Sequence, residues 1–328
     1  MKVGMTVPFA LMLCMAPLIS YGQTCCSGGV PLSSNLGMPP NDQGIWQFSI
    51  SYDHLVLSTL KEGSMLIDDQ SRIRKTQSIL TEIGYGITKR IAVDVFIPYV
   101  YQQRRIEQFG KTDFVTTNGI GDVALLLKYK LTDPLDTRQN LLIGIGPKMP
   151  TGKTDFTRTD GILLNADLQP GSGAWDGLIY AFYNRSFSFR PSMGFSLSTV
   201  ISIKGVNQDY LNGQSYQFGN ELVSQLSFSD KINLGKALFD LSLSLRFRKQ
   251  LSDSFNDTFL PNTGGHFLFF TPGIAYFLSS STSIIVSGDV PIYTYVDGTQ
   301  LAPSYRLNIG LFVTLRKKKN LDTKTIKL

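Results

Sequence analysis

Apolar and polar residues alternate strictly along residues 237–249, and this alternation predicts a β-strand with two different faces. Successive side chains of a strand point to opposite sides, so one face here is wholly apolar and the other is small, polar or charged. Such a strand occurs half-buried in a soluble protein or across a membrane in a β-barrel. The apolar face holds Ala237, Phe239, Leu241, Leu243, Leu245 and Phe247, and the polar face holds Asp240, Ser242, Ser244, Arg246 and Arg248.

Similar alternation along the rest of the chain predicts twelve strands separated by turn residues. One strand, 175–186, is ambiguous on both faces. Pro272 lies inside the tenth strand, and because proline cannot donate a ladder hydrogen bond we expect a bulge at 271–273. The predicted strands are 45–56, 77–87, 91–102, 120–131, 140–149, 175–186, 191–203, 215–228, 237–249, 265–278, 282–293 and 304–315.

The connections between these strands alternate between long and short. Those after odd-numbered strands are long, for example 57–76, 103–119, 150–174 and 250–264, and those after even-numbered strands are as short as 88–90. Outer-membrane barrels show this pattern, whereas a soluble Greek-key sandwich has no reason to. We therefore predict an all-β, membrane-spanning, up-and-down antiparallel β-barrel of about 12 strands over residues 45–315. A secreted soluble β protein is the competing fold.

Both ends of the chain lie outside the predicted barrel. Residues 1–22 have the features of a secretory signal peptide, whose apolar core is too short to span a bilayer. Residues 23–44 are predicted to form a loop or a small plug, and they contain Cys25 and Cys26, for which no metal site is expected. Residues 316–328 are predicted to form a basic tail. With an even strand count, both termini are expected in the periplasm of an outer-membrane protein.

The composition fits a barrel and argues against a nucleic-acid partner. Charged residues make up 17% of the chain, below the roughly 25% of an average soluble protein. The net charge is +6, but it comes from Lys2 and the tail, so the body is electrically balanced. The expected partners are outer-membrane lipid and a small-molecule solute, with no nucleic acid.

No arrangement of residues predicts catalysis, a cofactor or a metal site. The only two histidines, His54 and His266, are expected on the apolar parity near the outer rim of strands that are not neighbours. An outer-membrane hydrolase would need a partner for one of them on an adjacent strand. Residues 146–154 superficially resemble a phosphate-binding loop, but five residues separate the glycines instead of four and no helix follows.

The inward face is where selectivity would lie. Charged residues on the small, polar parity either neutralise one another in the lumen or line a pathway and select what passes. These lumen-lining candidates are Glu82, Asp94, Asp122, Lys128, Glu221, Asp240, Arg246, Arg248, Asp289 and Arg306.

Several glycine-rich motifs resemble one known family. They are 118–122 leading into 125–129, then 144–154, 169–176, 290–293 and 298–301. These segments are similar to the outer-membrane barrel family named for the MetA pathway of phenol degradation, and the likeness covers most of 45–315. The resemblance implies a channel or transporter for small solutes, including hydrophobic or aromatic ones, and supplies no catalytic residues. Two alternatives stay open: a structural or surface-interaction barrel without transport, and an outer-membrane hydrolase.

Overall fold

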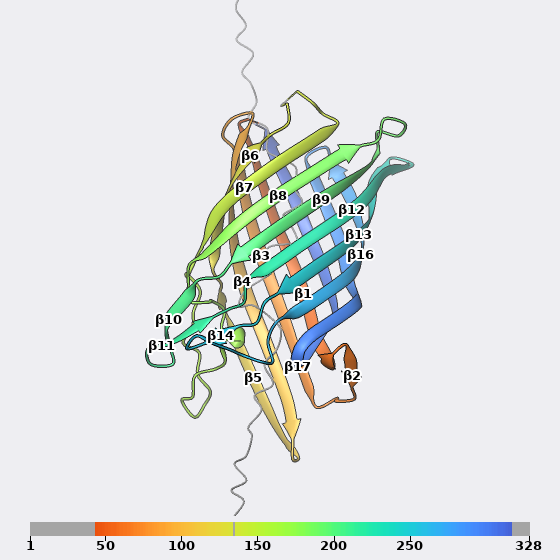
Figure 1. Ribbon diagram of the computed structural model, residues 1–328. Coiled ribbons are helices and arrows are strands. Elements are labelled where there is room, and N and C mark those ends of the chain that lie inside the picture. Colours follow the sequence, from red (N-terminus) through yellow and green to blue (C-terminus); the bar gives the residue numbers. More distant parts are fainter. Residues whose placement is uncertain (1–42, 134, 317–328) are drawn as a thin grey trace, which may run out of the picture.

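The computed structural model describes residues 43–133 and 135–316, and within them the chain forms one closed antiparallel barrel (Figure 1). The predicted signal peptide, nearly all of the predicted 23–44 segment and the tail beyond residue 316 lie outside the described residues. No helix among the described residues is long and apolar enough to cross a membrane.

Eleven labelled strands make the ring, and each pairs antiparallel with the next. The membrane-spanning barrel fold predicted from alternation is therefore confirmed. The ring strands are β1 (Ile45–Gly63), β3 (Arg72–Gly86), β4 (Ile91–Gln108), β6 (Val123–Lys130), β7 (Gln139–Met149), β8 (Asp176–Ser186), β9 (Met193–Ile203), β12 (Glu221–Leu234), β13 (Ala237–Gln250), β16 (Gly265–Ser279) and β17 (Thr282–Arg316).

The last strand, β17, is 35 residues long and runs the length of the barrel twice, once in each direction. Its first half pairs with β16 and its second half pairs with β1, from Val296 to the end. Gly298 has a φ of +71°, which a tight reversal of the chain requires. The backbone N–H of Thr314, in the second half, donates at 2.8 Å to the carbonyl oxygen of Ser281, which directly precedes the first half. Counting both halves, the ring has twelve spanning segments, in agreement with the predicted number.

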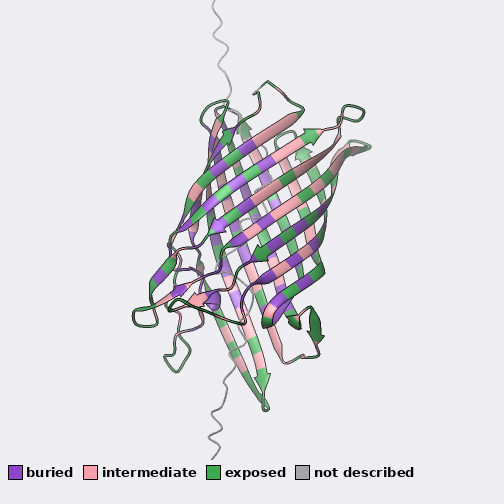
Figure 2. Cartoon of the chain, viewed as in Figure 1, coloured by how far each residue is buried: buried purple, intermediate pink, exposed green. Residues whose placement is uncertain are grey.

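The alternation in sequence becomes an alternation in exposure around the ring (Figure 2). On β13, Leu243 and Leu245 are exposed, whereas Ser244 and Arg246 between and beside them are buried. The ambiguous strand, now β8, points Leu178, Tyr180 and Phe182 inward. A belt of exposed apolar side chains therefore surrounds the barrel, as contact with lipid requires.

The two ends of the barrel differ. At the turn end, short connections such as 87–90 and 280–281 join the strands, and Ile45 pairs there with Arg316. At the loop end, which points downward in Figure 1, strands extend into regions predicted as loops. β1 runs on to Gly63 and pairs with β2 (Met65–Ile67), and β4 pairs with β5 (Lys111–Ile120) to form a long hairpin. The predicted loops 57–76 and 103–119 are thus partly strand.

A small four-stranded sheet caps the loop end. It consists of β10 (Val206–Tyr210), β11 (Gln214–Gln217), β14 (Ser254–Phe255) and β15 (Thr258–Phe259). The predicted strand 215–228 was wrong in position, because its first residues belong to β11 and the spanning strand β12 begins only at Glu221. The alternating aromatic residues Tyr216 and Phe218 of the cap caused this error, since they pack inside the cap rather than in the wall.

The bulge predicted at 271–273 is not found. Pro272 pairs with Leu243 of β13 in continuous register. Against β17, the pairing passes from Phe270–Val290 to Gly273–Ser287 without a change of register, and the shift lies instead between Leu268 and Phe269. The missing N–H of Pro272 is accommodated by leaving the ladder with β17 open over two residues, so no extra residue is needed.

Candidate functional site

The candidate site is the interior of the barrel, where the side chains of one parity meet. Of the ten predicted lumen-lining residues, nine are buried and Asp240 is half-buried. The structure brings most of them together as ion pairs, in three groups at different places on the inner wall. Their role in lining a solute pathway stays a prediction.

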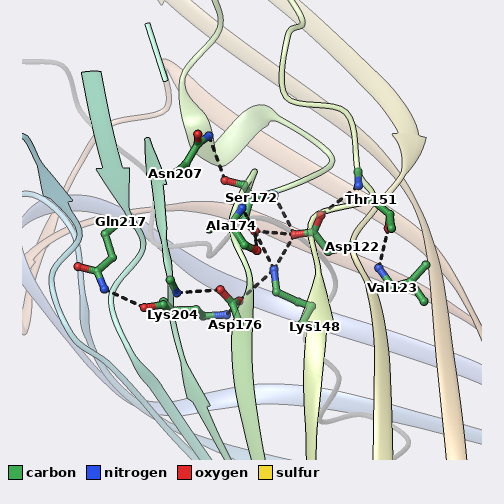
Figure 3. A network of polar contacts seen from close by, with 12 residues as sticks. Asp122, Val123, Lys148, Thr151, Ser172, Ala174, Asp176, Lys204, Asn207 and Gln217 are labelled. Atoms are coloured by element: carbon green, nitrogen blue, oxygen red, sulfur yellow. Dashed lines mark hydrogen bonds and ion pairs between the residues drawn. The ribbon is translucent and has the colours of Figure 1, made fainter. Parts of the chain in front are cut away.

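The first group lies at the loop end and is called here the loop-end network: Asp122, Lys148, Ser172, Asp176 and Lys204 (Figure 3). Lys148 Nζ lies 2.6 Å from Asp122 Oδ2 and 3.0 Å from Asp176 Oδ2. Lys204 Nζ lies 3.2 Å from the same Asp176 oxygen. Lys148 and Asp176 lie on the paired strands β7 and β8, Asp122 directly precedes β6, Lys204 directly follows β9, and Ser172 comes from a loop. All five side chains are buried. Charges of alternating sign across adjacent strands neutralise one another without solvent.

Ser172 belongs to a loop that folds into the mouth of the barrel. Residues 164–172, the mouth segment, are buried apart from Asn165 and include a short 3-10 helix, η2 (Ala166–Leu168). Arg74 Nη1 on β3 lies 2.6 Å from Asp167 Oδ2, and the Thr117 hydroxyl donates to the Leu168 carbonyl oxygen at 2.6 Å. The mouth segment is therefore fastened to the inner wall on two sides.

Close backbone contact also holds the mouth segment. A Cβ atom on Gly171 would lie 2.4 Å from the carbonyl oxygen of Gly152, a distance that no side chain tolerates. Glycine at position 171 therefore lets the two ends of the loop between β7 and β8 come into backbone contact. The segment thus narrows the loop end of the barrel.

The cap sheet carries its own buried polar pair. The Tyr216 hydroxyl donates to Asp253 Oδ2 at 2.7 Å, and the Gly219 backbone N–H donates to Asp253 Oδ1 at 2.8 Å. Burial raises the pKa of the Asp253 carboxyl, against the lowering effect of these hydrogen bonds. Burial also raises the pKa of the Tyr216 hydroxyl well above its ordinary value, with the Asp253 charge acting in the same direction.

The second group is called here the arginine cluster and lies on the wall made by β12, β13, β17 and β1. Arg306 Nε donates to Asp53 Oδ1 at 2.8 Å, Arg248 pairs with Glu221, and Arg246 pairs with Asp289. Each arginine therefore has a carboxylate of its own. The guanidinium of Arg246 also lies over the Phe269 ring, 4.8 Å from its centroid.

The third group, Glu82, Asp94 and Lys128, lies among apolar side chains. Lys128 pairs with Asp94, and the Ser49 hydroxyl donates to Glu82 at 3.2 Å. Around them the inward side chains of β3 to β9 pack against one another as a buried apolar cluster. It comprises Leu80, Phe96, Ala124, Leu126, Leu142, Leu178, Tyr180, Phe182 and Val200.

The opposite part of the interior is hollow. A chamber of about 250 Å³ lies against β9, β12, β13, β16 and β17. Seven of its sixteen lining residues carry hydroxyls, including Ser227, Ser242, Ser244 and Ser287, and short serines leave space that larger residues would fill. Arg246, Asp289 and Arg306 of the arginine cluster form its inner end.

Sequence reasoning missed several inward charges. Asp53 shares the inward parity of its strand, so the alternation already contained it, whereas Asp176 begins the strand that was ambiguous on both faces. Arg74 fell in a predicted loop, and Lys148 lies near the end of the predicted strand 140–149 but was not among the predicted lumen residues. Asp167 comes from a loop without periodicity, and no signal in the sequence places it inside the barrel.

The two histidines lie where the parity places them. His54 on β1 and His266 on β16 are half-buried, and these two strands do not pair. His266 stacks on Tyr295, with ring centroids 4.8 Å apart. The ring centroids of His54 and Tyr305 are 6.1 Å apart. Among the residues that the structure describes, no group of three or more His, Cys, Asp or Glu side chains is arranged to hold a metal ion.

Comparison with solved structures finds the same fold in outer-membrane proteins. The COG4313 outer membrane channel from Pseudomonas putida F1 matches 87% of this chain and 100% of its own, with a TM-score of 0.65 and 15% identity. The CymD monoaromatic hydrocarbon channel covers 85% of this chain and 90% of its own, with a TM-score of 0.39 and 8% identity. The P. putida toluene transporter TodX covers 86% and 92%, with a TM-score of 0.40 and 9% identity. Of these three, the similarity to the COG4313 channel shows the fold, and the fold alone.

Comparison by sequence gives the family. No curated protein matches the chain. The family model described as "Putative MetA-pathway of phenol degradation" matches residues 74–300. This range takes in the ring from β3 into β17 together with the mouth segment and the cap. Since the match covers more than half of the sequence, the chain belongs to the MetA-pathway phenol-degradation family.

Proposed function

We propose that this protein is an outer-membrane channel that lets small solutes pass through the barrel. The observation that carries the proposal is the contrast between the two faces of the ring. The outward face is an apolar belt suited to lipid, while the inward face encloses a chamber lined by hydroxyls and charges. The similarity in fold to a protein described as an outer membrane channel supports it.

The proposal includes an orientation and a role for the ten inward residues. The turn end, where Ile45 and Arg316 pair, faces the periplasm, and the loop end with its cap faces outward. Short periplasmic turns and longer external connections are the rule for such barrels. All ten charged lumen candidates face the interior, and four of them, Asp240, Arg246, Asp289 and Arg306, line the chamber that forms the path. Ion pairing makes this wall polar without giving it a large net charge. Neither histidine has a catalytic part, so the protein is not an enzyme.

A barrel without transport is the second candidate, and the mouth segment favours it. Residues 164–172 occupy the loop end and are fastened by Arg74 and Thr117. If the segment never moves, the loop end of the barrel stays narrowed, no solute passes through, and the protein is a structural barrel.

Conductance measurements separate the two candidates. The mature protein is reconstituted in planar bilayers beside two variants, Asp167→Asn, which removes the charge paired with Arg74, and Asp155→Asn, an exposed control in the same loop. We expect small steady conductance in the wild type and the control, and larger conductance in Asp167→Asn. Absence of conductance in all three proteins, with folded barrel present, contradicts a channel and leaves the structural role.

A further inference from the structure

The chamber has two ends with different chemistry. Its inner end, near the middle of the barrel, is formed by Arg246, Arg306 and Asn308. Toward the turn end it is bordered by three apolar side chains, Ala275, Ile285 and Phe312, with the half-buried Asp240 beside Ala275. The volume of about 250 Å³ is just below the range of pockets for drug-sized ligands, so it suits a molecule of about one ring.

Hydrogen-bond donors are left over at the inner end. Arg246 Nε, Arg306 Nη2 and Asn308 Nδ2 are buried and find no acceptor within residues 43–133 and 135–316. All three residues are more than nine-tenths buried and line the same chamber. Because an unsatisfied buried donor is costly, a solute that presents an acceptor to these groups gains more than it would in water.

The charges at this end are already balanced. Arg306 faces Asp53, Arg246 faces Asp289, and Arg306 Nη1 lies a further 3.9 Å from Asp289. Asp240, at the other end of the chamber, adds a negative charge. An entering anion would therefore meet no net positive charge, and what the wall offers is directed N–H groups and hydroxyls.

We infer that the chamber is a binding site for a small neutral solute with an apolar body and an oxygen that accepts hydrogen bonds, such as an aromatic alcohol. The oxygen lies at Arg246, Arg306 and Asn308, and the body lies toward Ala275, Ile285 and Phe312. This inference deepens the proposed channel function by naming the solute class. A pure hydrocarbon leaves the donors unsatisfied, and a carboxylate adds a charge that nothing at the site neutralises.

Three probes with the same ring and different substituents test the solute class: benzyl alcohol, toluene and benzoate. Binding to the purified, folded barrel in detergent is measured by ligand-observed NMR titration, without any membrane or flux. Benzyl alcohol is expected to bind at least about tenfold more tightly than the other two, the difference made by one well-satisfied polar group. Equal binding of toluene overturns the inference, and tightest binding of benzoate replaces it with an anion site.

Two variants and a control locate the site. Asn308→Leu removes one donor without breaking an ion pair, and should weaken benzyl alcohol binding about threefold to tenfold. Ser242→Leu fills the chamber and should abolish binding. Ser198→Leu is the control, because Ser198 is half-buried on the inward face of β9 but does not line the chamber. Unchanged binding in both test variants overturns the location.

The same samples separate failure of this inference from failure of the channel function. Binding with no conductance in bilayers keeps the site and removes the channel. Conductance with no binding of any probe keeps the channel and removes the site. As a folding control, each variant is first run on a gel without heating. A sample that stays folded under these conditions contains a closed barrel, and only such samples are used for the two measurements.

Discussion

The two sides of the barrel interior differ in how their inward side chains occupy the space: one side is packed, and the other leaves a chamber. From β3 to β9 a buried cluster of mostly large apolar side chains packs around Glu82, Asp94 and Lys128, and Phe96 and Leu126 in this cluster are almost fully buried. From β12 to β17 serines and charged residues surround a chamber, and the buried apolar cluster of Phe267, Phe269, Val296 and Ala302 lies outside its lining. Both sides have the same alternation, so the difference lies only in side-chain volume and polarity. In the proposed channel, the open space for a solute therefore lies on the side of the barrel with the serine-rich chamber.

The largest expected effect comes from one phenylalanine on each side. Phe96→Ala on the packed side should lower the free energy of unfolding by about 3–5 kcal/mol, because it leaves a cavity in a filled region. Phe312→Ala is the matched change on the hollow side, where the ring already borders the chamber, and should cost clearly less. Urea titration of refolded barrels measures both, and equal losses would remove the distinction between the two sides.

The next effect tests which face of β13 meets lipid. Leu243→Arg should destabilise the barrel by about 2–4 kcal/mol in lipid, the cost of a cation on the lipid face near the midplane. Ser244→Arg, one residue away on the chamber wall, should be tolerated much better. Cysteine at each position gives an independent reading, because a polar thiol reagent should label position 244 faster than position 243. Reversed labelling would place the chamber residues outside.

Adding volume should affect the two sides differently. Ala124→Leu overpacks the apolar cluster and should cost about 1–3 kcal/mol of stability with little change in conductance. Ser242→Leu occupies open space, so it should lower conductance and hardly change stability. Bilayer recordings and urea titration on both variants give the answer. Unaltered conductance with leucine at position 242 would mean that ions do not use the chamber.

The smallest expected effect is a pH dependence of the stability of the cap sheet at the loop end. The folded cap holds the Asp253 proton more tightly than the unfolded chain, whose carboxyl has a pKa near 3.8. The stabilisation from protonation is therefore complete below that value and is lost as the pH rises through the raised pKa. Amide exchange at Gly219, corrected for intrinsic rate, should slow as the pH is lowered from neutral. In Asp253→Asn the corrected rate should no longer depend on pH, and a persisting dependence would assign it to another group.

The alternation in the sequence predicted correctly on which face of its strand a side chain lies. It placed Leu243 outside and Ser244 inside because the side-chain period of a strand is two regardless of what lies across the barrel. It could not show that Phe96 belongs to a packed region while Ser242 borders a chamber, since this depends on residues facing one another from distant strands. Asp167 was invisible for a different reason: a loop residue inserted into the mouth has no periodicity to mark it.

The pairing of β1 with β17 also sets how the barrel can be completed during folding. Asp53 and Arg306 are 253 residues apart in sequence, so the ladder that joins them forms only after nearly the whole chain is available. Because both charges point inward beside each other, sliding one edge strand along the other would separate a buried cation from its carboxylate. The Asp53–Arg306 ion pair therefore favours the native register of the closing strands over shifted ones.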